Sequence, residues 1–171
     1  MKDSISIIRV NSLHPKIRQE VHDLIEKVEA KMPGCAVRIV QGYRTFAEQD
    51  ALYAQGRTTK GNVVTNSKAG QSYHNFGLAI DFALLYDKDN NGTYETMSWD
   101  LLKDFDKDGE ADWMEVVDTF EDAHYDWGGH WSSFKDNPHL EKRFGLHWKQ
   151  LLAKYNAKDF IPGTNYINIG M

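Results

Sequence analysis

The segment LAIDFALLY, residues 78–86, constrains the fold of this 171-residue chain more than any other. Its residues are apolar except for Asp81, and an apolar run of this length predicts a strand that is buried on both faces. A buried carboxylate is costly unless it is paired. The fold must therefore bring a partner to Asp81 in the middle of a buried strand.

His74 is the first candidate for this partner, although it lies seven residues before Asp81. Side chains alternate along a strand, so an odd separation places these two residues on opposite faces of one continuous strand. The tripeptide Asn75-Phe76-Gly77 predicts a bend between them, because glycine readily adopts a positive φ. We therefore expect His74 to fold back over the strand that carries Asp81.

Other patterns predict several helices and one more strand around this element. Apolar residues at three- and four-residue spacing favour one amphipathic helix, and Thr45 with Glu48 forms a capping box at the start of another. Helices are predicted over residues 14–32, 45–56, 113–124 and 147–155, and a short strand over residues 36–43. Strands scattered among helices predict an α+β fold with a small, mostly antiparallel sheet flanked by helices. We expect a single domain over residues 1–171.

The charge of the chain is strongly uneven. The formal net charge is −5, but residues 87–126 hold 14 Asp and Glu against 3 Lys, a net of −11, and the rest of the chain therefore carries +6. A localised acidic block favours a solvated face or a cation site and disfavours a nucleic-acid partner. We find no apolar run long enough for a membrane span or a signal peptide, so we expect a soluble protein without membrane insertion. We also expect a monomer.

A second cluster of polar residues lies near the C-terminus, in DNPHLE. Asp136 and His139 are three residues apart around Pro138, and in a turn their side chains face the same space. Two histidines and one carboxylate form the ligand set of a catalytic zinc site, in which one position stays open for water. Asp136 is then well placed to accept the proton of that water. A core histidine satisfied by a carboxylate explains His74 and Asp81 equally well at this point.

Four motifs in a fixed order decide between these readings. They are QGYRTFAEQDALYAQGR, SYHNFGLAIDFAL, WGGHW and DNPHLE, and they span the chain from about Leu13 to Tyr155. Together they resemble the zinc peptidoglycan peptidases of the VanY-type D-alanyl-D-alanine carboxypeptidase and L-alanyl-D-glutamate endopeptidase family. The resemblance is closest to the endopeptidase branch, which includes bacterial cell-wall enzymes and bacteriophage endolysins. It implies a fold of the D,D-peptidase/Hedgehog-like type with zinc in a cleft.

The resemblance also implies a role for each motif residue. His74, Asp81 and His139 match the zinc ligands, and Asp136 matches the catalytic acid/base. Arg44 matches an arginine that polarises the substrate carbonyl, although a structural pair with Glu48 is the alternative. Positions lining the same cleft are matched by Gln49 and Ser72. We expect Trp127 and Trp131 to form a cleft wall whose neighbouring glycines let substrate approach; the alternative is that both are core residues.

The acidic region contains a separate signal for calcium. In DFDKDGEADWME, residues 104–115, Gly109 occupies position 6 of an EF-hand loop, and acidic residues occupy positions 1, 3, 5, 7, 9 and 12, namely Asp104, Asp106, Asp108, Glu110, Asp112 and Glu115. We expect Ca²⁺ to bind to Asp104, Asp106, Asp108, Glu110 and Glu115. A similar start at Asp87 ends on Ser98, so we interpret it as a structural turn. The insertion covers about residues 87–115.

These inferences lead to one main functional hypothesis. The chain is predicted to be a zinc metallopeptidase that cleaves peptidoglycan stem peptides at the L-alanyl-D-glutamate bond. A D,D-carboxypeptidase that removes terminal D-alanine and a noncatalytic calcium-dependent binding module remain alternatives. We expect no separate wall-binding domain and action at the bacterial cell wall, after release through a holin or by another export route. We further hypothesise that calcium, through Glu115, orders the run that leads to Trp127 and Trp131.

Overall fold

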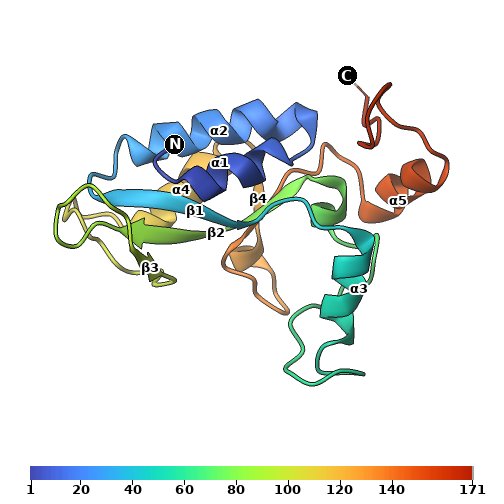
Figure 1. Ribbon diagram of the computed structural model, residues 1–171, viewed down its shortest axis with the longest axis horizontal. Helices are drawn as coiled ribbons and strands as arrows, with labels where there is room; N and C mark the ends of the chain where they lie inside the picture. Colours follow the sequence, from blue (N-terminus) through green and yellow to red (C-terminus); the bar gives the residue numbers. More distant parts are fainter. Residues whose placement is uncertain (171) are drawn as a thin grey trace.

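A five-stranded antiparallel sheet forms the centre of the computed structural model, which describes residues 1–170 (Figure 1). Its strands are β1 (Cys35–Gln41), β2 (Ala79–Tyr86), β3 (Thr96–Ser98), β4 (Asp126–Trp127) and β5 (His139–Glu141). The order is β1-β2-β5-β4, and β3 also pairs with β2. β1 covers one edge of β2, while β3 and β5 pair with opposite ends of β2 along the other edge. The predicted antiparallel α+β fold is confirmed.

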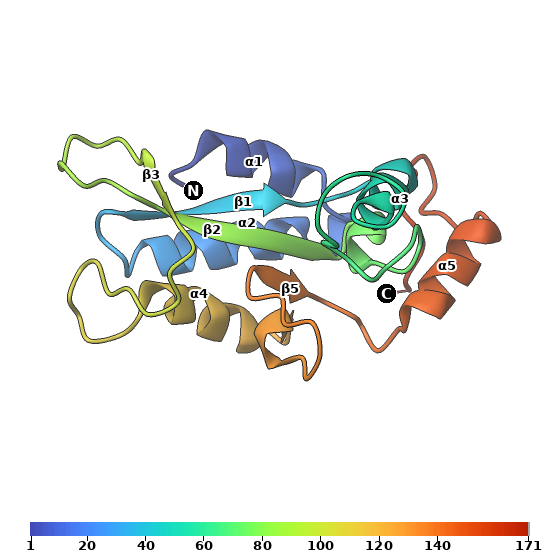
Figure 2. The same cartoon turned by 90° about the horizontal axis from the view of Figure 1, so that it is seen from below.

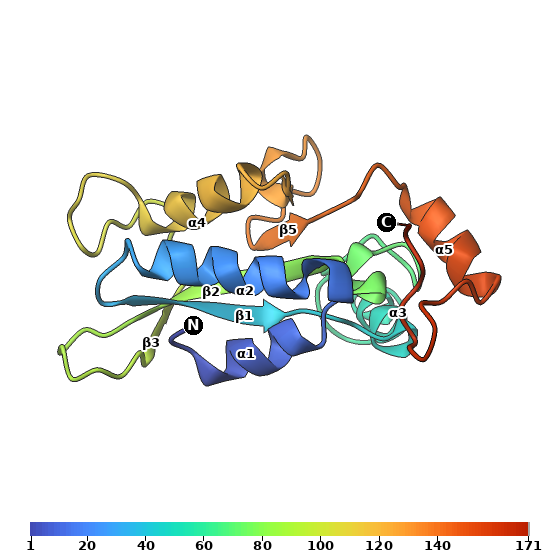
Figure 3. The same ribbon diagram turned by 90° about the horizontal axis from the view of Figure 1, so that it is seen from above.

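Three helices cover one face of this sheet, as Figures 1 and 3 show. They are α1 (Ser4–Asn11), α2 (Pro15–Glu29) and α4 (Asp112–Glu121). Two more helices, α3 (Phe46–Ala54) and α5 (Trp148–Asn156), lie beyond one end of the sheet. Short 3₁₀ helices are formed by Tyr73–Phe76 and Gly128–His130. No helix among residues 1–170 combines the length and the apolar character that a membrane crossing needs.

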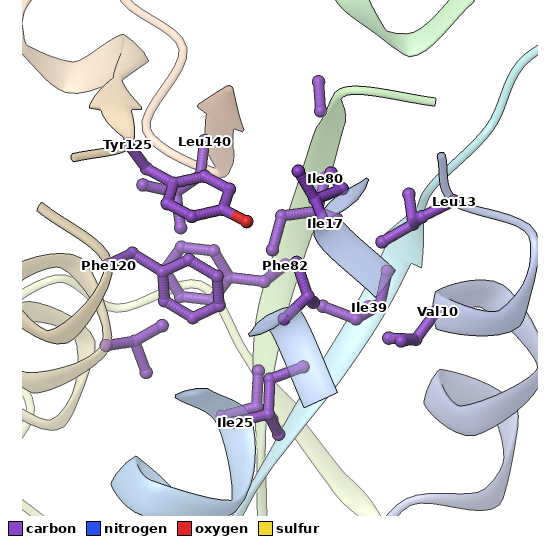
Figure 4. Packing of buried hydrophobic residues seen from close by; sticks show 14 of the residues in the cluster. Val10, Leu13, Ile17, Ile25, Ile39, Ile80, Phe82, Phe120, Tyr125 and Leu140 are labelled. Atoms are coloured by element: carbon purple, nitrogen blue, oxygen red, sulfur yellow. The ribbon is translucent and has the colours of Figure 1, made fainter. Parts of the chain in front are cut away.

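The hydrophobic core lies between β2 and the covering helices (Figure 4). Ile17 and Ile25 of α2 and Phe120 of α4 are fully buried together with Ile80 and Phe82 of β2. These two β2 residues are two positions apart, so they point to the helix-covered face. Asp81 therefore points to the opposite face of the sheet.

Most predicted elements are present, but α1 is a helix that the sequence patterns did not indicate. Its residues Ile5, Ile7 and Ile8 are exposed, so the apolar spacing carries no helix signal. The helix is held by polar contacts instead. Asp3 caps it by accepting from the backbone N–H of Ser6, and Ser6 Oγ accepts from Ile39 N–H at 2.7 Å in β1.

The bend before β2 forms where it was predicted. Gly77 has φ of 69°, in the left-handed region, and its N–H closes the 3₁₀ turn on His74. A Cβ at this position would lie 2.7 Å from the backbone nitrogen of His14, so only glycine fits. The bend returns His74 to the end of β2 that carries Asp81.

The acidic insertion forms two loops at the end of the sheet that is opposite to α3 and α5 (Figure 2). The first joins β2 to β3, and Asp87 holds it by accepting from the N–H groups of Asn91 and Gly92 at 3.0 and 2.8 Å. The second leads into α4. Residues 99–111, which precede α4, contain no helix.

Candidate metal centre and active site

Three predicted ligands meet on the open face of the sheet. His74 Nε2 lies 3.1 Å from Asp81 Oδ1 and 3.2 Å from His139 Nδ1, and His139 Nδ1 lies 3.0 Å from Asp81 Oδ1. Asp81 and His139 are paired across β2 and β5, while the bend at Gly77 delivers His74. The fold therefore brings residues from three separate segments to one point.

Hydrogen bonds on the far side of each imidazole fix which ring nitrogen faces this point. His74 Nδ1–H donates to the carbonyl oxygen of Gly42 at 2.8 Å. His139 Nε2–H donates to Glu141 Oε2 at 2.8 Å. The facing nitrogens, His74 Nε2 and His139 Nδ1, are then free to offer lone pairs to a cation, as metal-bound histidines do when a partner orients them.

The chemistry of this donor set fits zinc. Two imidazole nitrogens and one carboxylate oxygen are the ligands of many catalytic zinc sites, and a tetrahedral site has ligand-to-ligand distances of about 3.3 Å. The observed separations of 3.0–3.2 Å are close to this value. His74 and His139 are buried and Asp81 is half-buried, so a cation here is held by the protein rather than by a solvated face.

The electrostatics of the site indicate the same preference for positive charge. Burial alone lowers the pKa of His139, but its hydrogen bonds to Asp81 and Glu141 outweigh burial and raise the pKa. Burial alone raises the pKa of Asp81, but His74 and His139 lower it overall. The carboxylates around His139 therefore favour positive charge at this point, and a cation would compete for it with a proton.

Asp136 lies beside the three ligands on the wall of the same cavity. It starts the turn that carries His139, whose backbone N–H donates to the carbonyl oxygen of Asp136 at 3.1 Å. Burial and the nearby Asp81 raise the pKa of the Asp136 carboxyl above its usual value, although His139, His74 and Arg44 oppose them. A carboxylate with a raised pKa is a better proton acceptor near neutral pH.

Arg44 faces the metal centre rather than its helical neighbour. Its Nη2 lies 3.5 Å from Asp81 Oδ2, and its Nη1 donates to Gln49 Oε1 at 3.0 Å. Glu48 is engaged in the predicted capping box with Thr45 instead. Burial lowers the pKa of Arg44, but Asp81 and Asp136 counteract this, so two carboxylates and one buried amide position the guanidinium.

The prediction made for Gln49 is corrected by the structure. It was expected to line the cleft, but its side chain is fully buried behind the cavity wall and is not part of the lining. Its Nε2 donates to the carbonyl oxygen of Ser67 at 2.8 Å while its oxygen accepts from Arg44. Gln49 therefore ties Arg44 to the loop that follows α3.

A cavity of about 670 Å³ opens above the metal centre. Its walls come from the 64–73 loop, from the segment around Asp136 and from the start of α5. Ser72 and Trp131 line it as expected, and the Trp131 ring lies 5.1 Å from the His139 ring, centroid to centroid. The cavity is large enough to hold several residues of a peptide around the metal centre.

Trp127 lies away from the cavity wall and packs against the hydrophobic core, which agrees with the alternative of a core position. Trp127 does not line the cavity; its Nε1–H donates to the carbonyl oxygen of Asn137 at 2.7 Å and so holds the turn before His139. A Cβ on Gly128 would collide with the carbonyl oxygen of Asp136, and one on Gly129 with the Trp127 ring. These glycines make room for neighbouring atoms of the protein rather than for a substrate.

Glu141 is a site residue that the sequence reasoning missed. It is buried, and its second carboxylate oxygen accepts from Arg143 Nε at 2.7 Å while the first holds His139. Arg143 in turn lies 3.1 Å from Asp126. The sequence could have indicated this residue. Residues two apart on a strand share a face, so the tripeptide HLE places Glu141 beside His139.

The predicted calcium residues fall into two overlapping groups. The carboxylates of Asp104, Asp106 and Asp108 lie within 4.8 Å of one another, and so do those of Asp106, Asp112 and Glu115. Glu110 is exposed and belongs to neither group, so the structure does not bring its side chain to the site. Its place in the loop pattern is one that EF-hands fill with a backbone carbonyl.

Comparison with known proteins was made by sequence and by fold. A family described as D-alanyl-D-alanine carboxypeptidase matches residues 65–142, a segment that contains His74, Asp81, Asp136 and His139. The peptidoglycan L-alanyl-D-glutamate endopeptidase CwlK of Bacillus subtilis (strain 168) is 47% identical over 131 residues, which cover 77% of this chain and 74% of CwlK. The chain belongs to the VanY-type peptidase family.

Two other members of the comparison are more distant. The L-alanyl-D-glutamate peptidase of Listeria phage A118 is 29% identical over 138 residues, and the match spans 81% of this chain but only 41% of the phage protein. The crystal structure of the L-Ala D-Glu endopeptidase ChiX of Serratia marcescens aligns with a TM-score of 0.52 at 18% identity. That alignment covers 82% of this chain and 88% of ChiX, so the family fold extends over most of both chains.

Proposed function

We propose that this chain is a zinc-dependent peptidoglycan peptidase that hydrolyses the L-alanyl-D-glutamate bond of stem peptides. The observation that carries the proposal is the convergence of His74 Nε2, Asp81 Oδ1 and His139 Nδ1 beside Asp136, under a cavity of peptide size. The name and 47% identity of CwlK support the choice of bond.

Each nearby residue has a distinct role in this proposal. His74, Asp81 and His139 would hold a zinc ion, which would supply Lewis-acid chemistry that polarises a carbonyl and makes water nucleophilic at neutral pH. The Asp136 carboxylate accepts the proton of the attacking water and passes it to the departing amine. Arg44 lies on the cavity wall with its Nη2 3.5 Å from Asp81 Oδ2, and it donates to the oxygen on which negative charge develops.

Substrate contacts are assigned to the cavity walls. Ser72 and Trp131 lie on the wall and are proposed to contact the stem peptide directly. Gln49 and Trp127 are proposed to act at one remove, by positioning Arg44 and the turn before His139. The expected binding residues are thus divided into those that touch substrate and those that position others.

A second candidate activity is the removal of terminal D-alanine. The description of the matched family, D-alanyl-D-alanine carboxypeptidase, favours it. Both activities use the same metal chemistry and differ in which bond reaches the metal centre.

Mass spectrometry of muropeptides digested with the zinc-loaded protein separates these activities. We expect fragments that begin with D-glutamate and no loss of single D-alanine residues. Loss of D-alanine alone would favour the carboxypeptidase, and an unchanged muropeptide pattern would favour a noncatalytic binding module. An Asp136→Asn protein is the control, because it conserves the shape of the site but cannot accept a proton.

A calcium ion is proposed as a second cofactor, bound in the loop over residues 104–115. The loop already has a turned shape that suits an ion, because the N–H groups of Lys107 and Gly109 donate to Asp104 at 2.6 and 3.1 Å.

We also propose that the protein acts at the bacterial cell wall and is released to it as an endolysin is. The phage relative supports this proposal. The monomeric state stays a prediction.

A further inference from the structure

Two buried carboxylates at the start of α4 each have an oxygen without a partner. Asp112 is 0% exposed and Glu115 is 6% exposed. Within the described chain, Asp112 Oδ1 and Glu115 Oε2 make no hydrogen bond. An unpaired carboxylate oxygen inside a protein is costly, and it points to a missing cation or donor.

These two carboxylates face a third one from the exposed loop. Ligand atoms of Asp106, Asp112 and Glu115 all lie within 4.8 Å of one another. The other oxygen of Asp112 is already used, since it accepts from Tyr86 Oη at 2.8 Å and from Phe105 N–H at 3.0 Å. Burial and the repulsion of Asp108, Asp106, Asp112 and Glu110 raise the pKa of Glu115 to about 7.

We infer that a divalent cation of the calcium type binds between the 104–110 loop and the start of α4, with Asp106, Asp112 and Glu115 as ligands, and that this ion supports the geometry of the zinc centre. The second half of this inference rests on the proposed function. The chemical class follows from the donors, since an all-carboxylate set without imidazole or thiolate suits a hard cation such as Ca²⁺.

The new element in this ligand set is Asp112. Its anchored oxygen joins the ion to Tyr86, the last residue of β2, so the site is part loop and part core. An ion bound only by the exposed carboxylates would order the loop and nothing else. An ion that also binds Asp112 and Glu115 neutralises buried charge at the first turn of α4 and thereby fixes this helix against the sheet.

A short chain of contacts connects α4 to the zinc centre. Trp113, between the two buried carboxylates in sequence, is 1% exposed, and its ring lies 4.4 Å from the ring of Phe82, centroid to centroid. Phe82 follows Asp81 directly, and its N–H donates to the carbonyl oxygen of Pro138 at 3.1 Å. Pro138 directly precedes His139.

This path differs from the one expected from the sequence. The sequence suggested coupling along the chain from Glu115 to a cleft wall at Trp127 and Trp131, and of these two residues Trp131 lines the cavity. The contact of Trp113 on Phe82 instead reaches the pair Asp81 and His139, which are neighbours across β2 and β5. Through this contact the ion acts on the spacing of two zinc ligands.

Calorimetric titration with Ca²⁺ tests the site itself. We expect calcium to bind to the wild-type protein and its affinity to fall at least about tenfold in Asp112→Asn and in Glu115→Gln, because each loses a charged ligand. Asp118→Asn is the matched control, since Asp118 is an exposed acid on the same helix outside the cluster. Near-UV circular dichroism checks that each variant is folded. Wild-type affinity in both cluster variants, or no calcium binding to the wild type, overturns the site.

Zinc titration with and without calcium tests the coupling. Calcium is removed beforehand by dialysis against a chelating resin, and the zinc dissociation constant is then measured with a competing chromophore. We expect calcium to lower this constant about fivefold or more, and by linkage zinc should tighten calcium binding by the same factor. Asp118→Asn should retain the full effect, and Glu115→Gln should lose it.

The outcomes distinguish the inference from the proposed function. Equal zinc affinity at all calcium concentrations, with calcium bound, overturns the coupling and leaves the proposed function standing. Absence of zinc binding under every condition overturns the proposed function and with it the coupling, while the calcium titration still decides whether the site exists.

Discussion

Replacement of Glu141 by glutamine tests whether the hidden partner of His139 controls the zinc centre. The two carboxylate oxygens of Glu141 accept hydrogen bonds from opposite sides, from His139 Nε2 at 2.8 Å and from Arg143 Nε at 2.7 Å. Glutamine has one acceptor and one donor in the same places. In either orientation of the glutamine amide, its NH₂ group faces another hydrogen-bond donor, either Arg143 Nε–H or His139 Nε2–H.

The size of the effect follows from these contacts. A hydrogen bond that involves a charged group contributes about 1.5–3 kcal/mol, and loss of an outer partner of a metal-bound histidine costs about 10–100-fold in metal affinity. Both ranges agree, since each tenfold change corresponds to about 1.4 kcal/mol. We therefore expect the zinc dissociation constant of Glu141→Gln to rise about 10–100-fold. His139 and Glu141 are both buried, so water cannot replace the contact between them, whereas the Arg143 side chain is 46% exposed.

Zinc competition with a chromophoric chelator measures this change directly. Glu121→Gln is the matched control, because Glu121 also contacts a histidine, His130, at 3.0 Å, but this histidine is 65% exposed and is not a proposed ligand. The control should keep the wild-type zinc affinity. If Glu141→Gln also keeps it, Glu141 does not orient His139 and the reasoning is refuted.

Four further substitutions test the other roles. His139→Ala should lose both zinc binding and peptide hydrolysis, and full activity in that protein would remove His139 from the ligand set. Asp136→Asn should retain zinc, measured by metal content, but lose at least about 100-fold in the rate of muropeptide cleavage; loss of zinc would instead make Asp136 a ligand. Arg44→Lys should lower the rate because an ammonium lacks the planar fork of donors, and near-normal rates would return Arg44 to a structural role. Gly128→Ala should weaken zinc binding as well as cleavage, since the new Cβ meets Asp136 and His139; an increase of KM alone would restore the idea that substrate approaches this glycine.

The central part of the fold was predictable because its signals are local. The apolar run around Asp81 identified β2, and amphipathic spacing identified α2. The bend at Gly77 followed from the odd separation of His74 and Asp81 together with a residue that permits positive φ. The α1 helix gave no such signal, because it is held by contacts of Asp3 with Arg38 and of Ser6 with Ile39, and these partners lie far along the chain.

The ligands were likewise easier to predict than the residues around them. His74, Asp81 and His139 stand out because they match the zinc ligands of the family that the four motifs resemble, although the residues alone left a core histidine as an alternative. Trp127 and Gln49 do not stand out in this way. A tryptophan or a glutamine can line a cleft or can lie behind the cleft wall and hold it in place. Only the fold decides which side of the wall each side chain takes.

The alternation of side chains along β2 explains how one strand could serve both proposed metal sites. Asp81 points to the open face and contributes to the zinc centre, while Phe82 and Tyr86 point to the helix-covered face. On that second face, Tyr86 holds Asp112 and Phe82 contacts Trp113, so both ends of the acidic site rest on the same strand. In the proposed coupling, a change at the cation loop would reach the zinc centre through the thickness of a single strand, although the two proposed sites lie on opposite faces of the sheet.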